Sequence, residues 1–313
     1  MSTGIKAVKT ALAANLFIFL MKLGAALLTR SAGMMAEAVH SFADAGNQIL
    51  LLVGFKRSQK PPDEGHPFGY GKEEYFWSFI VAMILFVLGS VYSLYEGVHK
   101  LMHPEPLRYV YINFMILGTA VALEGYSWWV AKKSIGGTSI KSTLKAVIDS
   151  KDANAVVVFV EDTGALVGLA VALAGNVAAY LTGDPFYDAV SSIAIGLLLL
   201  VIAYFLANEM RKLIIGETAD AVSIEKARAI LLKHPHVKNI SYMRSMHLGS
   251  SSSLLAVYAD FVDSLHDYEL EETMSCLIAE IKAAVPEAKD VFLQLSGKGV
   301  CSDHQGVRPL KGR

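Results

Sequence analysis

The chain has 313 residues, of which 53% are hydrophobic and only 18% are charged, and its mean hydropathy is +0.42. Soluble domains carry about 25% charged residues, so this composition excludes an ordinary soluble domain and indicates a membrane protein. The formal net charge of -1 gives no reason to expect nucleic acid as a partner. The spacing of the cysteines, Cys276 and Cys301, supports no disulfide, and we expect free thiols.

Six apolar segments are long enough to cross a hydrocarbon layer of about 30 Å at about 1.5 Å per residue. We expect them near 8–29, 33–55, 74–99, 109–132, 153–181 and 186–209. The first segment lacks a convincing signal-peptide cleavage site, so it should stay in the mature chain. The chain breakers Gly183, Asp184 and Pro185 predict a tight turn before the sixth segment.

The basic residues of the connecting loops predict the orientation of these segments. One side of the membrane has eleven of them: Lys6, Lys9, Lys56, Arg57, Lys60, Lys72, Lys132, Lys133, Lys141, Lys145 and Lys151. The other side has three, which are Arg30, Lys100 and Arg108. We therefore predict a multi-pass protein of the inner (cytoplasmic) membrane with both termini in the cytoplasm.

The composition changes from about Thr218, where charged residues return. The pattern predicts a helix from Ser223 as its cap to about Lys233, strands near 237–247 and 253–263, a helix near 268–284 and a strand near 289–295. The predicted fold class is therefore a membrane all-α bundle of six transmembrane helices followed by a small α+β domain of order α-β-β-α-β. We assign a transport domain to 1–215, a cytoplasmic α+β domain to 216–297 and a disordered tail to 298–313.

The second apolar segment carries polar residues at steps of three and four, which places them on one helical face. They are Glu37, His40, Ser41, Asp44, Asn47 and Gln48. A carboxylate inside a bilayer is costly unless it meets a partner, water or a metal. The imidazole of His40 and the carboxylate of Asp44, one turn apart, suit a divalent transition metal. The alternative is a buried polar pair that only fastens two helices together.

The fifth apolar segment supplies the counterpart through Glu161 and Asp162. Neighbouring helical residues point about 100° apart, so one of the two faces the metal. We take this to be Asp162, with Glu161 sharing the site or binding protons. Asn154 lies two turns before Asp162 on nearly the same face. The alternative is pairing with a basic residue, but apart from Lys22 no Lys or Arg interrupts the apolar spans.

Protons compete with metal for imidazole and carboxylate groups, so exchange of H⁺ for a divalent metal follows from these residues. The proton-coupling candidates are His40, Asp44 and Glu161, together with Glu124 in the fourth segment. For Glu124, a proton path and a hydrogen bond between helices are both open.

Two further acidic positions have a simpler interpretation. Asp63 and His66 could form an entrance site for the ion, but their stretch, PPDEGHPFGYG, is first a rigid turn fixed by Pro and Gly. Asp188 is best explained as a cap of its own helix.

Four stretches resemble the cation diffusion facilitator family, the zinc-transporter type of metal/proton antiporters. They are SAGMMAEAVHSFADAGNQILLLVG (31–54), HPFGYGKEEY (66–75), EDTGALVG (161–168) and GDPFYDAVSSIAIG (183–196). The chain looks most similar to the branch that includes the mitochondrial zinc transporters and their bacterial relatives. The resemblance implies a homodimer, a metallochaperone-like cytoplasmic domain and export of Zn²⁺ by alternating access. It implies no cofactor beyond the transported ion.

The chain departs from the family pattern in its fifth span, where His-x-x-x-Asp is common. Aligning that Asp with Asp162 leaves Val158 in place of the His, so Glu161 or Asn154 is left to complete the site. An extra oxygen ligand makes Mn²⁺, Fe²⁺ or Co²⁺ acceptable alternatives to Zn²⁺. The histidines of the α+β domain are scattered and predict no metal cluster: His234, His236, His247 and His266.

Other functions remain as alternatives. A metal uniporter or channel would use the same ligands without proton coupling, and a metal-sensing membrane scaffold would report through the α+β domain. An enzyme is not expected, since neither His-Glu-x-x-His nor Gly-x-Ser-x-Gly occurs.

Overall fold

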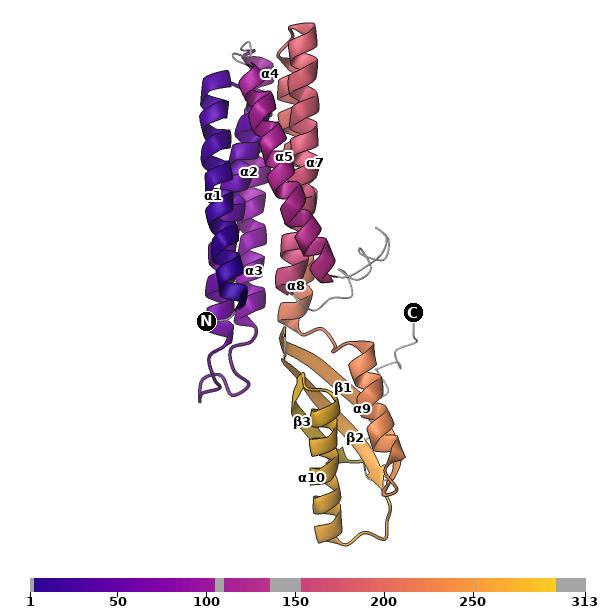
Figure 1. Cartoon of the computed structure of the whole chain (residues 1–313). Coiled ribbons are helices and arrows are strands. Elements are labelled where there is room, and N and C mark those ends of the chain that lie inside the picture. The colour runs from indigo at the N-terminus through magenta and orange to yellow at the C-terminus, as the bar shows by residue number, and fades with distance from the viewer. Residues whose placement is uncertain (1–2, 105–109, 136–152, 251, 297–313) are drawn as a thin grey trace. The chain divides into compact units, whose positions relative to one another are not determined.

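The computed structural model describes residues 3–104, 110–135, 153–250 and 252–296 (Figure 1). The chain divides into two compact units, Met1–Ile215 and Gly216–Arg313. The predicted tail (298–313), Cys301 and the loop residues Arg108, Lys141, Lys145 and Lys151 lie outside the described residues.

The first unit is built from helices. They are α1 (Thr3–Thr29), α2 (Ala32–Ser58), α3 (Glu73–Ile84), the π-helical η1 (Leu85–Val91), α4 (Tyr92–Met102), α5 (Val110–Ile135), α7 (Ala153–Thr182) and α8 (Phe186–Ile215). The helices α3, η1 and α4 follow one another without a break, so that Glu73–Met102 forms one stretch of 30 residues.

Among the described residues, three stretches are long and apolar enough to cross a membrane. They are Glu73–Met102, Phe159–Thr182 and Phe186–Ile215, and a shorter apolar stretch covers Asn15–Thr29. The helix α2 has sufficient length at 27 residues, but the polar residues in its middle make it less apolar. The structure therefore supports a helical membrane unit with three strong spans.

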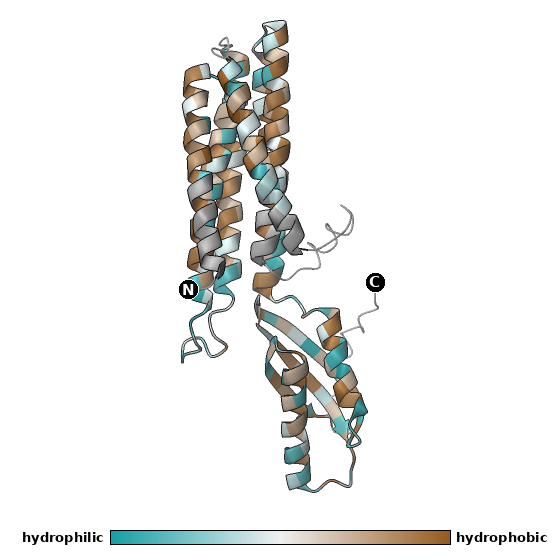
Figure 2. Ribbon diagram, viewed as in Figure 1, coloured by the Kyte–Doolittle hydropathy of each residue, from teal (hydrophilic) through white to brown (hydrophobic). Residues whose placement is uncertain are grey.

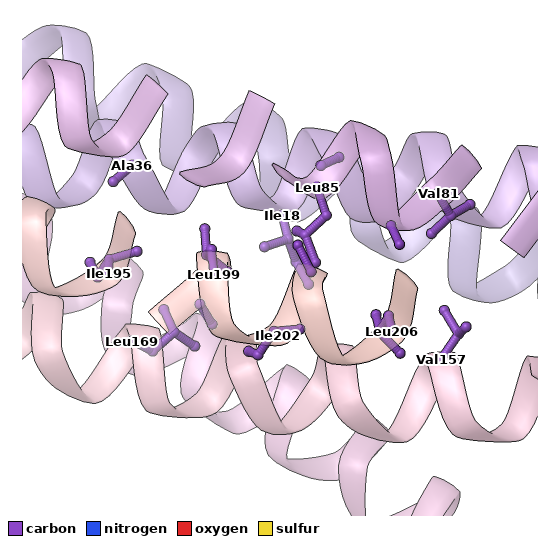
Figure 3. Close-up of a cluster of buried hydrophobic side chains, with 14 of the residues drawn as sticks. Ile18, Ala36, Val81, Leu85, Val157, Leu169, Ile195, Leu199, Ile202 and Leu206 are labelled. Carbon is purple, nitrogen blue, oxygen red and sulfur yellow. The ribbon is translucent and has the colours of Figure 1, made fainter. Parts of the chain in front are cut away.

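Close contacts between helices explain how this unit packs. Facing helices contribute apolar side chains to one core, including Leu85 of η1, Leu169 of α7 and Leu199 of α8 (Figure 3). At Gly97 of α4, an added Cβ would lie 2.6 Å from Ile193 and 2.9 Å from the backbone oxygen of Ala189 in α8. Small residues let helices approach closely, which is the usual way in which membrane helices associate.

The second unit has the predicted order of elements. These are α9 (Ala221–Lys233), β1 (Val237–Gly249), β2 (Ser252–Phe261), α10 (Asp267–Ala284) and β3 (Ala288–Leu295). The sheet order is β1-β2-β3, with β1 antiparallel and β3 parallel to β2. Alternate residues of β2 are buried and share a core with the two helices, through side chains such as Val257, Leu231 and Leu277.

The start of α9 corrects one prediction. The sequence suggested Ser223 as the cap, but Asp220 fills this role, since its Oδ1 accepts from the backbone N–H groups of Val222 (2.8 Å) and Ser223 (2.9 Å). A carboxylate can accept from two of the unpaired N–H groups in the first turn, so Asp220 caps the helix in preference to the later Ser223.

Candidate metal site in the helical unit

The polar face of α2 lies inside the helical unit. Glu37, His40 and Asn47 are at most 1% exposed, and the side chain of Asp44 is 14% exposed. In Figure 2, the helices of this unit are mostly brown, with scattered hydrophilic residues. The period of the helix brings these residues to one side, as the sequence predicts.

His40 and Asp44 have unused capacity to bind a ligand. The distance from Nε2 of His40 to Oδ2 of Asp44 is 3.7 Å, which is too long for a hydrogen bond. Within the described part of the chain, neither ring nitrogen of His40 nor Oδ1 of Asp44 has a hydrogen-bond partner, and the same holds for Oδ1 of Asn47 and Oε1 of Gln48. Buried polar groups are normally paired, so these polar atoms without partners need an explanation.

The fifth predicted span, α7, meets this face through Glu161. Nδ2 of Asn47 donates to Oε1 of Glu161 at 2.5 Å, and Glu161 is only 6% exposed. Glu161 also interacts electrostatically with Asp44 and with Asp162. Glu161 therefore contacts α2, and Asp162, which the sequence predicts to face the metal, interacts electrostatically with Glu161.

The candidate ligands do not yet form a closed cage. In the described residues, no group of three or more His, Cys, Asp or Glu side chains is close enough to hold a metal ion. Asn154 belongs to α7, but its side chain lies outside the described part of the structure.

Lys22 of α1 forms a second polar cluster beside this face. Its Nζ donates to Oε2 of Glu37 (3.1 Å), to Oγ of Ser41 (2.8 Å) and to Oε1 of Glu124 in α5 (2.8 Å). Glu124 therefore makes the bond between helices that was one of its two predicted roles. No role was predicted for Lys22 from the sequence, although a single basic residue that interrupts the apolar spans was a signal.

The loop between α2 and α3 has the geometry of a turn. Oδ1 of Asp63 accepts from the backbone N–H of His66 (2.7 Å), and Oδ2 accepts from the hydroxyl of Tyr70 (2.6 Å). The hydrogen bond from Tyr70, and to a smaller extent the one from the backbone of His66, hold the pKa of Asp63 below its usual value. Nδ1 of His66 lies 3.5 Å from Asp63, and both side chains are exposed. The carboxylate is thus engaged by its own loop, as the turn interpretation predicts.

Asp188 has a different role from the predicted one. Its carboxylate accepts from Oγ of Ser31 (2.6 Å) and from the backbone N–H groups of Ala32 (2.6 Å) and Gly33 (3.3 Å). Asp188 therefore binds the N-terminus of α2 rather than that of its own helix, where Oδ1 of Asp184 accepts from the N–H of Phe186. A negative charge at a helix N-terminus is favourable, and the packing of the helices places the N-terminus of α2 beside Asp188.

Comparison with known proteins decides the family. The sequence profile of the cation efflux transmembrane domain matches residues 8–215, which is the helical unit apart from its first residues. The chain belongs to the cation diffusion facilitator family. Proteins of this family are transporters rather than enzymes, and metal ions are their substrates, so no cofactor is required. The family predicted from the sequence is confirmed.

Relatives within the cation diffusion facilitator family carry different metals. The chain is 36% identical over 259 residues to metal tolerance protein C4 of Arabidopsis thaliana, covering 82% of this chain and 57% of that protein. It is 32% identical over 301 residues to the mitochondrial proton-coupled zinc antiporter SLC30A9 of Xenopus laevis, covering 94% and 54%. It is 29% identical over 241 residues to the manganese efflux system protein MneP of Bacillus subtilis, covering 76% and 78%. The chain thus spans a little over half the length of the first two relatives.

Proposed function

We propose that this protein is a secondary active transporter that exports a divalent transition metal, with Zn²⁺ as the first choice, from the cytosol in exchange for protons. The observation that carries this proposal is that, within the described residues, the ring nitrogens of His40 and Oδ1 of Asp44 lack hydrogen-bond partners, on the face of α2 that Asn47 joins to Glu161 of α7. Imidazole and carboxylate groups bind divalent transition metals and also bind protons, so one site can serve both ions in turn.

The proposal includes the wider organisation predicted from the sequence. The proposed transporter has six transmembrane helices in 1–215, a cytoplasmic α+β domain in 216–297 and a disordered tail in 298–313. Both termini lie in the cytoplasm of a cell with an inner membrane, and two copies form a homodimer that works by alternating access. In support, the Asn47–Glu161 hydrogen bond joins α2 to α7 one turn away from Asp44, so that two helices contribute candidate ligands to one face.

The ligand set favours Zn²⁺ but admits other metals. One imidazole and two or three oxygens would form a weaker and harder site than two imidazoles, and such a site accepts Mn²⁺, Fe²⁺ or Co²⁺. The relatives named for zinc antiport and for manganese efflux are consistent with this range. The proposed ligands are His40, Asp44 and Glu161, with Asp162 and Asn154 as further candidates. Asp63 and His66 stay candidates for an entrance site.

Transport in proteoliposomes tests the proposal. Protein is reconstituted with a pH-sensitive and a metal-sensitive dye, and a proton gradient is imposed in the presence of Zn²⁺, Mn²⁺, Fe²⁺, Co²⁺ or Ni²⁺. We expect metal flux that dissipates the proton gradient, and its loss in His40→Ala and Asp44→Ala. His99→Ala is the matched control, because His99 is exposed on α4 and should leave transport unchanged.

Two outcomes would change the assignment. Metal flux that ignores the proton gradient would indicate a uniporter or channel. Flux that survives both His40→Ala and Asp44→Ala would place the metal site elsewhere. Glu161→Ala and Asp162→Ala separate the two acids, because the ligand is the one whose removal abolishes flux.

A further inference from the structure

Lys22, Glu37, Ser41 and Glu124 form a buried polar cluster that joins α1, α2 and α5. Lys22 and Glu37 are completely buried, Ser41 is 2% exposed and Glu124 is 8% exposed. The ammonium group of Lys22 uses its three N–H bonds on three different partners, at 2.8 to 3.1 Å. The geometry is therefore that of a built site for a cation, which Lys22 itself fills.

The charges of this cluster do not balance. One ammonium faces two carboxylates, so the cluster carries one excess negative charge when both acids are ionised. An uncompensated charge in a membrane interior is strongly unfavourable. Each carboxylate also keeps one oxygen without a hydrogen-bond partner among the described residues, namely Oε1 of Glu37 and Oε2 of Glu124. One proton on either acid would neutralise the cluster.

The packing leaves little room for any larger ion at Glu37. A Cβ added at Gly168 of α7 would lie 2.4 Å from Oε1 of Glu37, so the α7 backbone closes over this oxygen. A proton needs no such space. The cluster is thus suited to a proton rather than to a second metal ion.

The cluster lies within electrostatic reach of the candidate metal ligands. Glu37 precedes His40 by three residues on α2, which is about one turn, and Glu124 interacts electrostatically with Glu37, His40 and Asp44. Outside the cluster, the titratable groups that interact with it are His40 and Asp44 on α2, and Asp44 interacts in turn with Glu161 on α7, next to Asp162. A divalent ion at His40 and Asp44 would bring two positive charges next to the acids and favour their ionised forms.

We propose that Glu37 and Glu124, held in place by Lys22, form a proton site separate from the metal site, which releases its proton when metal binds at His40 and Asp44. The proposal rests on the proposed function, because it assigns one of the exchanged protons to this cluster. In the release step, an O–H bond of one carboxylic acid breaks, its electron pair stays on the carboxylate and the proton passes to the solvent. Lys22 is a positioning residue.

Calorimetric titration of the purified full chain with Zn²⁺ tests this site. Titrations in buffers of different ionisation enthalpy give the number of protons released for each ion bound. We expect Glu124→Gln or Glu37→Gln to lower that number by about one, because an amide cannot supply the proton. A plot of the logarithm of the affinity for Zn²⁺ against pH should become less steep by the same amount, which is about one proton for each ion bound.

Two Lys22 variants test the positioning role. Lys22→Met removes the cation and is expected to change the number of protons released, whereas Lys22→Arg keeps a charged donor and should preserve it. A purely structural role of the cluster would change the affinity for Zn²⁺ without changing the proton number. The melting temperature of each variant in detergent shows whether it is folded.

The outcomes separate this inference from the proposed function. Zn²⁺ binding with the wild-type proton number in both Glu124→Gln and Glu37→Gln overturns the separate proton site and leaves the transporter assignment intact. An unchanged number in Lys22→Met overturns the positioning role. No Zn²⁺ binding by the wild-type chain overturns both proposals.

Discussion

Two polar regions of the helical unit differ in how completely their groups are paired. Around Asp188, at the N-terminus of α2, both carboxylate oxygens accept hydrogen bonds, and Nζ of Lys100 lies 3.7 Å from Oδ2 and donates to the backbone oxygen of Arg30. Asn176 of α7 joins the same network by donating to Ser31. In the middle of α2, by contrast, His40 and Asp44 have ring nitrogens and a carboxylate oxygen without partners in the described residues.

The difference distinguishes groups that hold the fold from groups available to a ligand. A buried polar group costs free energy unless it is paired, so the paired network stabilises the bundle and the unpaired face is maintained at a cost. Asn113, which donates to Asn176 in this network, is the exception, because its Oδ1 has no hydrogen-bond partner within the described part of the chain. Substitutions in the two regions should therefore lower the free energy of unfolding by different amounts.

The largest loss of stability is expected for Asp188→Asn. The new amide would present N–H donors to the donors of Ser31 and Ala32 and leave Lys100 without its carboxylate. Breaking a buried charge pair costs about 3–5 kcal/mol, so we expect a clear fall in melting temperature in detergent. Asp184→Asn in the exposed turn is the control. A fall no greater than that of the control would mean that the paired network does not hold the bundle together.

A smaller loss is expected for Gly97→Ala, near the same end. Its Cβ would meet Ile193 at 2.6 Å and backbone atoms of α8 at 2.9 Å, and backbone cannot move aside easily. Overpacking of this kind costs about 1–3 kcal/mol. Gly118→Ala is the matched control, because nothing lies within 4 Å of its added Cβ and alanine favours the helix. Equal melting temperatures for the two variants would contradict close packing of α4 on α8.

In the second unit, Asp220→Ala should cost about 1 kcal/mol by removing the cap of α9. Burial raises the pKa of Asp220, but the hydrogen bonds from Ser223 and Val222 outweigh it, so the pKa lies below its ordinary 3.8. The cap therefore stabilises the helix above about pH 4 and is lost as the pH falls through the lowered pKa. Hydrogen exchange of α9 in the full chain should be about 5-fold faster in the variant at neutral pH. An unchanged rate would contradict the cap.

The smallest change of stability is expected for Asp44→Asn, although the substitution is the same as at Asp188. Oδ1 of Asp44 has no hydrogen bond to lose within the described chain, and the amide removes a buried charge. We expect a change within about 0.5 kcal/mol, or a gain, together with loss of Zn²⁺ transport. Destabilisation as large as that of Asp188→Asn would show that Asp44 holds the fold rather than a metal.

The sequence predicted local features well and pairings poorly. It placed the polar residues of α2 on one face and gave the order of elements in the second unit, because helical and strand periods depend on neighbouring residues. It assigned Asp188 to its own helix and gave Lys22 no partner. These errors concern contacts between helices, which period and composition do not specify.

By itself, the sequence determined the family, the apolar helices and a polar face with imidazole and carboxylate groups. Sequence motifs, the length of apolar segments and helical periodicity all depend on residues that are close together along the chain. Only the tertiary structure decided which of these groups are paired. Ser31 and Asp188 are 157 residues apart, and Lys22 and Glu124 are 102 apart. Such pairs depend on how each helix is rotated and which helix packs beside it, and that is settled by the close packing of many small side chains at once.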